Sequence, residues 1–185
     1  MARTSMAALL TRLRLLVNDP AGASQTFSDD DLQRVLDGQR FDARYSPLAP
    51  IDTIAAGGAI TWLSWEADRG DWEDSATFVD GSYNALTVSS SDLIRGIWTF
   101  ATSQTAGVLL SGAAYNLYAA AADVLEILAS RKASEFDFSA DNASFKRSQA
   151  VEQLRSQAAA YRDRAGAWGK DGTAGAGAYA IEVYV

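Results

Sequence analysis

The sequence contains no cysteine and no histidine among its 185 residues. Without cysteine the chain can form no disulfide, no zinc-thiolate site and no thiol nucleophile. Without histidine it lacks the most common general base and the most common metal ligand of proteins. These two absences exclude most familiar catalytic arrangements. We therefore expect a protein that is not an enzyme and has no catalytic residues, cofactor or metal ion.

Clustered positive charge is also lacking. The chain has 16 lysine and arginine residues against 23 aspartate and glutamate residues, a formal net charge of -7, and an isoelectric point near 4.5. Tight binding of nucleic acid through its phosphates requires clustered lysine and arginine. The composition therefore argues against a protein that binds DNA tightly through its phosphates, although the protein could still be located next to DNA.

Long uninterrupted hydrophobic runs are missing as well. Arg12 and Arg14 interrupt the apolar N-terminal stretch, which makes it a poor signal peptide. The longest apolar stretch, residues 107–130, contains Asp123 and Glu126, which are costly at the centre of a bilayer. We expect a soluble protein that is made inside the cell and does not contact a membrane.

Two stretches near the C-terminal end have the pattern of long helices. Apolar residues recur at spacings of three and four over residues 114–128 and again over 145–168. The intervening sequence DFSADNAS is rich in residues that favour turns and helix starts. This pattern predicts a long antiparallel helical hairpin. We therefore expect an α+β fold that is mainly a helical bundle built on this hairpin.

Two shorter helices are predicted near the N-terminus. The first covers residues 4–17, with Thr4 or Ser5 as its cap. The second starts at Ser28 and ends near residues 38–40; Asp31, three residues after Ser28, completes a capping-box pattern. Asp29 and its two acidic neighbours fit the start of a helix, where the helix dipole favours negative charge.

Between the helices the pattern changes to the alternation of strands. Strand-like segments follow one another from residue 59 to 110, separated by turn residues. Residues 41–58 hold two of the three prolines and are predicted as an extended connection. The expected domains are a helical adaptor domain (1–58 and 111–168), an inserted antiparallel β lobe (59–110) and a flexible C-terminal arm (169–185) that ends in a short strand.

Acidic residues are concentrated at one turn of the predicted β lobe. Four of them could form a calcium loop or an acid and base pair, and they are Asp68, Asp71, Glu73 and Asp74. Together with Glu66 they are also the candidates for the two acids of a cell-wall glycosidase. They lack the spacing of an EF-hand loop, so a solvated turn is the better interpretation. The tripeptide Arg69-Gly70-Asp71 matches an adhesion motif, but three residues recur by chance.

Four of the five tryptophans also lie in the predicted lobe. Trp62 and Trp65 have opposite parity, so one of them faces outward if the strand is regular. An exposed surface of Trp62, Trp65 and Trp72 could bind a protein partner or stack on sugar rings. A carbohydrate- or host-surface-binding module is therefore an alternative function.

Two parts of the sequence resemble a known family. Residues 115–165 (YNLYAAAADVLEILASRKASEFDFSADNASFKRSQAVEQLRSQAAAYRDRA) and 27–43 (FSDDDLQRVLDGQRFDA) are similar to the head-to-tail adaptor proteins of long-tailed bacteriophages, also called connector or head-completion proteins. The most specific pieces are Tyr115–Glu126 and Phe136–Gln149. The resemblance implies a structural virion protein at the head-tail interface, present in the host cytoplasm during assembly.

The resemblance also implies partners. The protein would form a ring of about twelve copies beneath the portal protein and provide a docking site for a tail-terminator or stopper protein. Genomic DNA would pass through the ring without tight binding, as the acidic composition suggests. The terminal segment YAIEVYV could fold back onto the chain's own sheet or add a strand to a partner's sheet. Its candidate portal interface is Tyr179, Ile181, Val183, Tyr184 and Val185.

Overall fold

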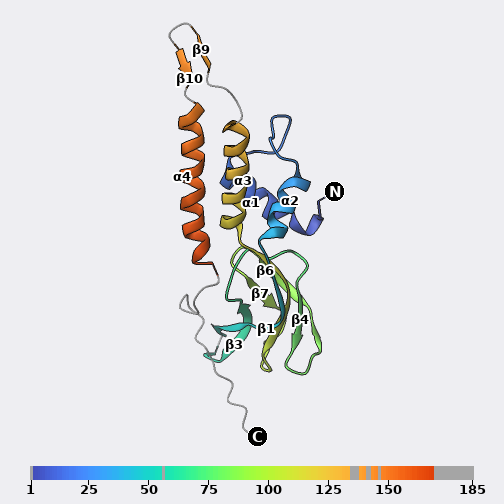
Figure 1. Ribbon diagram of the computed structural model, residues 1–185. Helices are drawn as coiled ribbons and strands as arrows, with labels where there is room; N and C mark the ends of the chain where they lie inside the picture. Colours follow the sequence, from blue (N-terminus) through green and yellow to red (C-terminus); the bar gives the residue numbers. More distant parts are fainter. Residues whose placement is uncertain (1, 56, 134–137, 141–142, 146, 169–185) are drawn as a thin grey trace. The chain divides into compact units, whose positions relative to one another are not determined.

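The chain is divided into a helical unit and a β unit that is inserted within it (Figure 1). The computed structural model describes residues 2–55, 57–133, 138–140, 143–145 and 147–168. The helical unit consists of Met1–Arg40 and Tyr115–Trp168, and the β unit contains Phe41–Ala114. The β unit is thus longer at both ends than the lobe expected over residues 59–110.

Helix α3 lies at the centre of the helical unit, with α1 and α2 on one side and α4 on the other (Figure 1). Its buried face uses small and aliphatic side chains, which allow the other helices to approach closely. The elements are a 3-10 turn η1 (Thr4–Met6), α1 (Ala7–Val17), α2 (Asp29–Gly38), α3 (Leu117–Ala133) and α4 (Arg147–Gly166). A short antiparallel pair, β9 (Phe138–Ala140) and β10 (Ala143–Phe145), lies between α3 and α4.

Helix α4 packs through one apolar stripe, in which Ala158 is the only fully buried side chain of its described part and Val151, Leu154 and Ala165 are partly buried. The Tyr161 hydroxyl donates to the Leu16 carbonyl at 2.9 Å. Arg162 forms an ion pair with Glu126 of α3. These polar contacts add to the burial of the apolar stripe.

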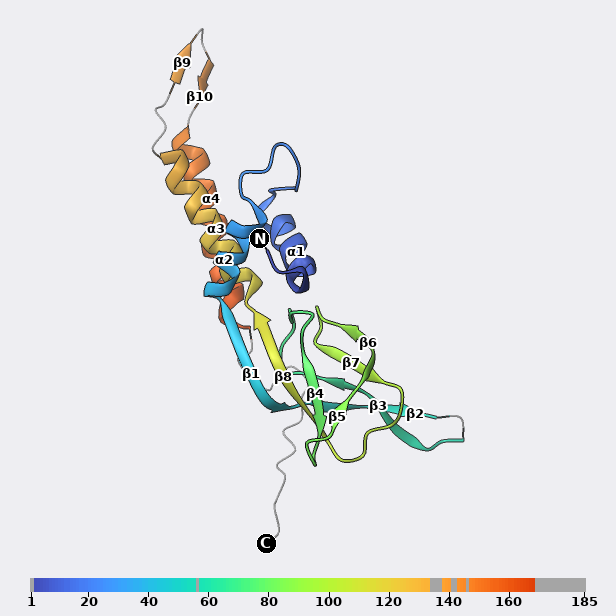
Figure 2. The same ribbon diagram turned by 90° about the vertical axis from the view of Figure 1, so that its right-hand side faces the viewer.

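The β unit contains two four-stranded sheets (Figure 2). The first has the order β1-β8-β4-β5, with β1 at Arg40–Pro47, β8 at Val108–Tyr115, β4 at Thr77–Asp80 and β5 at Ala85–Leu86. The second has the order β2-β3-β7-β6, with β2 at Ala49–Ile54, β3 at Ile60–Glu66, β7 at Ile97–Phe100 and β6 at Val88–Asp92.

Aromatic side chains join the two sheets. Phe78 of β4 lies 5.1 Å from Trp98 and 5.7 Å from Phe100, both on β7, measured between ring centroids. Trp72 meets Trp98 edge to face at 5.6 Å. These rings are at most 5% exposed, and burial of their aromatic surface stabilises the unit. Gly96 permits this packing, since a Cβ there would lie 2.3 Å from the Arg69 carbonyl oxygen.

The expectation of a mainly helical bundle built on a long hairpin is wrong. The fold is a mixed α+β fold with four α-helices and two antiparallel four-stranded sheets among the described residues. Two of the strands that were not predicted are β1 and β2, which lie in the segment predicted as a connection because of its prolines. Pro47 ends β1 and Pro50 lies in β2, an edge strand, where a missing N–H is tolerated.

None of the described helices is long and apolar enough to span a membrane. The predicted capping box of α2 is confirmed, with Ser28 and Asp31 bonded to each other in both directions. The expected cap of the first helix is not: η1 precedes it, and neither η1 nor α1 has a side-chain cap.

Candidate interaction site

The acidic turn before β4 is packed only in part, since Glu73 is buried whereas Asp68 and Asp74 are exposed. The Arg69 guanidinium binds Asp68 at 2.7 Å and lies 3.8 Å from the centre of the Phe41 ring. A Cβ on Gly70 would come within 2.0 Å of the Ile94 carbonyl oxygen, so the tripeptide Arg69-Gly70-Asp71 sits in a tight turn. Across the described ranges, no group of three or more acidic residues is placed to hold a metal ion.

The acidic start of α2 serves the fold. Asp29 accepts a hydrogen bond from Arg14 at 2.7 Å. Asp31 accepts from the Ser28 hydroxyl at 2.7 Å and from its backbone N–H at 3.2 Å. These two bonds, the hydroxyl first, lower the pKa of Asp31 below its ordinary value. Both carboxylates are therefore explained by helix capping and ion pairing.

The three tryptophans expected on an exposed surface have different environments. Trp65 is 4% exposed and Trp72 is 1% exposed, so both are core residues rather than surface side chains. Burial follows from their neighbours: Trp65 pairs with Trp98 across β3 and β7, and Trp72 packs on the same ring. Trp62 is only partly buried, and its indole N–H donates to Asp52 at 2.9 Å.

The candidate portal interface in the C-terminal arm lies outside the described residues. This applies to Tyr179, Ile181, Val183, Tyr184 and Val185, and to the arm from residue 169 onward.

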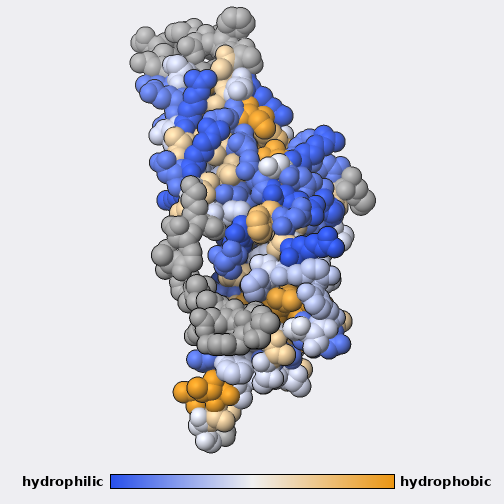
Figure 3. All heavy atoms as spheres, turned by 60° about the horizontal axis from the view of Figure 1, so that its bottom comes forward, coloured by the Kyte–Doolittle hydropathy of each residue, from blue (hydrophilic) through white to orange (hydrophobic). Residues whose placement is uncertain are grey.

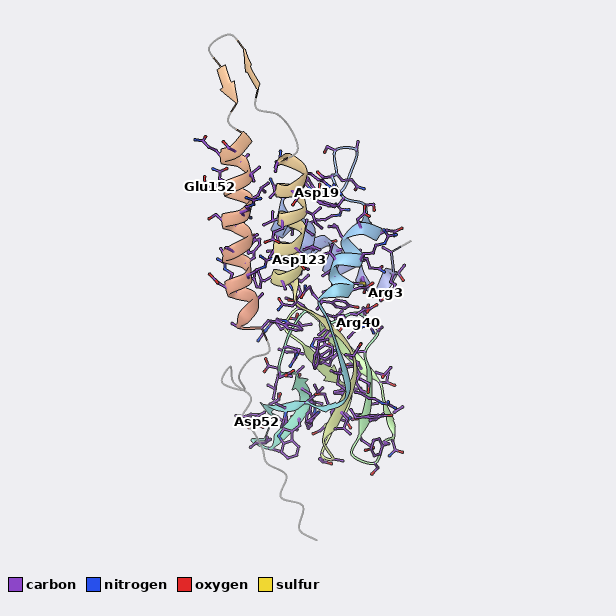
Figure 4. All side chains as sticks on the ribbon, in the orientation of Figure 1. Arg3, Asp19, Arg40, Asp52, Asp123 and Glu152 are labelled. Carbon is purple, nitrogen blue, oxygen red and sulfur yellow. The ribbon has the colours of Figure 1, made fainter. Side chains whose placement is uncertain are left out.

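The hairpin formed by β2 and β3 exposes an apolar end, which we call the hairpin tip (Ile54 and Ile60). The two isoleucines are directly paired across the strands and are 76% and 60% exposed. No charged residue occurs from Thr53 to Thr61. Figure 2 shows the hairpin extending beyond the other strands of its unit, and Figure 3 shows a hydrophobic patch at its end. Asp52, labelled in Figure 4, lies on β2 beside this tip.

A second exposed cluster lies on the other sheet, and we call it the tyrosine pair (Tyr45 and Tyr83). The two rings meet edge to face at 5.4 Å, yet they are 46% and 66% exposed. The Arg44 guanidinium lies 5.8 Å from the centre of the Tyr45 ring. Aromatic rings and arginine are the side chains most enriched at the energetic centres of protein interfaces.

Both tyrosines have a left-handed backbone, with φ of 52° for Tyr45 and 64° for Tyr83. This conformation is uncommon for bulky residues and costs on the order of 1–3 kcal/mol each. Hydrogen bonds hold each one in place: the Tyr45 N–H donates to Ser111 Oγ at 3.0 Å, and the Tyr83 N–H donates to the Asp80 carbonyl at 2.9 Å. Strain of this kind, held by surrounding contacts, is typical of functional surfaces.

The turn that presents Tyr83 is built by Asp80. Its carboxylate accepts hydrogen bonds from the backbone N–H groups of Ser82 and Asn84, at 2.8 and 2.9 Å, and from the Asn84 side chain at 2.9 Å. The Asn84 side chain is the largest cause of a lowered pKa of Asp80. The carboxylate is therefore charged at neutral pH and holds the turn firmly.

Sequence reasoning missed both surfaces, although one signal was present. Gly57-Gly58, flanked by strand-forming residues, is a hairpin signal, and both glycines have positive φ. The assignment of residues 41–58 to a connection concealed it. The tyrosine pair has no local signal, because Tyr45 and Tyr83 come together only through the order of strands β1, β8 and β4.

Comparison with protein-family models, with curated proteins and with solved structures found no match to this chain.

Proposed function

We propose that this protein is a non-enzymatic head-to-tail adaptor of a long-tailed bacteriophage. It forms a ring beneath the portal, continues the DNA channel and provides the docking site for a tail-terminator or stopper protein. The proposal begins from the resemblance of residues 27–43 and 115–165 to that family.

The exposed apolar hairpin tip is the observation that carries the proposal. Ile54 and Ile60 are two exposed aliphatic side chains of an acidic protein that lie directly opposite each other at the end of a hairpin. Exposure of two adjacent isoleucine side chains to water is unfavourable, and contact with an apolar surface of a protein partner would remove this cost. A structural protein that docks on others is the class that such a surface favours.

The charge of the chain supports the same proposal. A net charge of -7 would repel the phosphates of DNA, so a duplex could slide through a ring of such subunits. A basic lining would hold the duplex instead. The virion and, during assembly, the host cytoplasm are the locations that go with this role.

The alternative of a carbohydrate-binding module has lost most of its basis. It required an exposed tryptophan surface, and burial of Trp65 and Trp72 leaves only Trp62 partly accessible. A single indole whose N–H is already bonded to Asp52 is a poor platform for a sugar ring.

The proposal is tested by the mass of the purified protein, alone and mixed with its portal ring, by light scattering after size-exclusion chromatography. We expect a complex of ring size with the portal. A protein that stays a monomer of 19.7 kDa and ignores the portal would contradict the proposal.

Deletion of residues 171–185 gives a sharper test of the C-terminal arm. We expect the truncated protein to lose portal binding and to keep the circular dichroism spectrum of the intact chain, since the described helices and strands end before the deletion. If the truncated protein binds the portal as well as the intact chain does, the arm is not required for portal binding.

A further inference from the structure

The hairpin tip and the tyrosine pair are two surfaces of the same unit that remain largely exposed among the described residues. They lie on different sheets: Ile54 and Ile60 on strands of the second sheet, Tyr45 and Tyr83 on the first. Their exposed fractions of 46–76% show that they do not cover each other within one copy. Among the described residues, neither surface is covered by the other, so each is available to a second molecule.

The chemistry of the two surfaces is complementary. The hairpin tip offers two aliphatic side chains, and the tyrosine pair offers exposed ring surface on which aliphatic groups pack well. Each surface also has one charge beside it, of opposite sign. Beside the tyrosine pair, Arg44 contacts the Tyr45 ring and makes no ion pair within the described residues. Beside the hairpin tip, Asp52 accepts a hydrogen bond from the Trp62 indole through Oδ1, which leaves Oδ2 available to a cation.

Pairing of backbone edges is a less suitable way to join copies. The free edges of the second sheet are β2 and β6. Pro50 lies in β2, and both strands have an irregular register, at Ile51/Thr53 in β2 and at Val88/Ser90 in β6. Prolines and bulges at edges are features that oppose strand addition. Contact through side chains is therefore favoured.

We propose that the hairpin tip of one copy docks on the tyrosine pair of a second copy, with Asp52 of the first facing Arg44 of the second. The occupant is a second copy because this chain supplies both halves of the complementary contact. The two halves differ, so the contact is head to tail, and repetition of such a contact generates a ring when the rotation closes. The inference rests on the proposed function and identifies the surfaces through which its ring forms.

Pairs of introduced cysteines test the contact directly, because the chain has no cysteine of its own. Full-length protein with Ile60→Cys is mixed with full-length protein with Tyr83→Cys under mild oxidation. A disulfide requires the two Cα atoms to approach within about 7 Å. We expect the mixed dimer to form with a yield about tenfold or more above that of either variant alone, since docked thiols have a high effective concentration.

Leu15→Cys provides the matched control. Leu15 is 77% exposed and lies on α1 in the helical unit, so it is as accessible as Ile60 and outside both surfaces. Its mixture with Tyr83→Cys should give only background cross-linking. Equal yields from the Leu15 and Ile60 mixtures would overturn the inference, and so would preferred Ile60–Ile60 dimers, which indicate a symmetric contact.

A charge exchange separates the contact from effects on folding. Asp52→Arg and Arg44→Asp are each expected to lower the cross-linking yield at least about threefold when introduced alone into the appropriate partner. Introduced together, one in each partner, they should restore it. Failure of the combination to restore the yield would contradict the proposed pairing of these two charges.

The outcome also distinguishes this inference from the proposed function. Specific Ile60–Tyr83 cross-linking without binding to the portal supports the contact and contradicts the adaptor role. If the protein binds the portal but the Ile60–Tyr83 cross-linking yield is no higher than that of the Leu15 control, the adaptor role is supported and the proposed contact is contradicted.

Discussion

Arg14 is the residue that organises the connection between α1 and α2. Its side chain is 6% exposed and pairs with Asp19 at 3.2 Å and with Asp29 at 2.7 Å. It also donates to the carbonyls of Asp19 and Phe27, at 3.0 and 2.9 Å. A guanidinium can satisfy several acceptors at once in a fixed geometry, which is why arginine suits this buried position. In the sequence it was noted only as an interruption of an apolar run.

Replacement of Asp19 is expected to destabilise the helical unit. Its carboxylate accepts the N–H groups of Thr26 and Phe27, at 2.6 and 3.1 Å, in addition to pairing with Arg14. Asp19→Ala would leave a buried cation short of one partner and two backbone donors unpaired. We expect a loss of about 3 kcal/mol in the free energy of unfolding, measured by urea denaturation with circular dichroism.

The exposed ion pair of Arg34 and Asp31 supplies the comparison. Its side chains are 80% and 48% exposed, and its atoms are 3.7 Å apart. Pairs of this kind contribute little, so Arg34→Ala should change the free energy of unfolding by less than about 0.5 kcal/mol. If Asp19→Ala and Arg34→Ala lower the free energy of unfolding by similar amounts, the buried contacts of Arg14 do not stabilise the unit more than an exposed ion pair does.

At the scale of the element, α2 depends on its capping box. Ser28→Ala removes the acceptor of the Asp31 N–H, now bonded at 3.1 Å, and the hydroxyl donor to the Asp31 carboxylate. Loss of the serine cap should cost about 1 kcal/mol of stability, measured by the same denaturation. Thr4→Ala is the matched control, because η1 and α1 have no side-chain cap and Thr4 is exposed.

The same variant should change the titration of Asp31. Its pKa lies below the ordinary value of 3.8, first because of the Ser28 hydroxyl. A lowered pKa stabilises the folded state at pH values above the unfolded pKa, and this contribution is lost as the pH falls through the folded pKa. In Ser28→Ala the pKa of Asp31 should rise toward 3.8, as followed by carboxyl NMR titration; an unchanged pKa would assign the shift to other groups.

Elements with a strong local signal could be predicted from the sequence. The capping box located the start of α2, and the three-and-four spacing located α3 and α4. The strands from β3 to β8 followed from alternation and turn residues, with the exception of β6. Its residues Ser89, Ser90 and Ser91 were assigned to a turn, yet an exposed edge strand accepts serines because neither face of it requires burial.

The interaction surfaces were not predicted from the sequence, because they depend on pairing between distant segments. Opposite parity predicted that one of Trp62 and Trp65 faces outward, without saying which one, and it could not show that Trp72 packs on Trp98. The tyrosine pair required knowledge that β1 and β4 flank β8. Burial and pairing are properties of the whole sheet, so local patterns do not contain them.

For the molecule as a whole, the β unit is an insertion whose two ends meet. The chain leaves the helical unit at Arg40 and returns at Tyr115. At this point the Asn116 N–H donates to the Gln39 carbonyl at 3.1 Å. Arg3 contacts the chain on both sides of the insertion, since it binds Asp37 of α2 at 2.7 Å and the hydroxyl of Tyr115 at 2.9 Å. The helical unit therefore positions its own junction without needing a contact from the β unit.

It follows that the helical unit should fold without the β unit. We expect a variant in which a short Gly/Ser linker replaces residues 41–114 to be monomeric and helical by circular dichroism, with a cooperative thermal transition, because closing a short loop between adjacent ends costs little entropy. Its Arg3→Ala derivative should melt at a lower temperature, since the contacts to Asp37 and Tyr115 would be lost. Two outcomes would contradict this expectation: the linker variant is unfolded or aggregated, or its Arg3→Ala derivative melts at the same temperature. Either one would show that the β unit holds the two ends of the helical unit together.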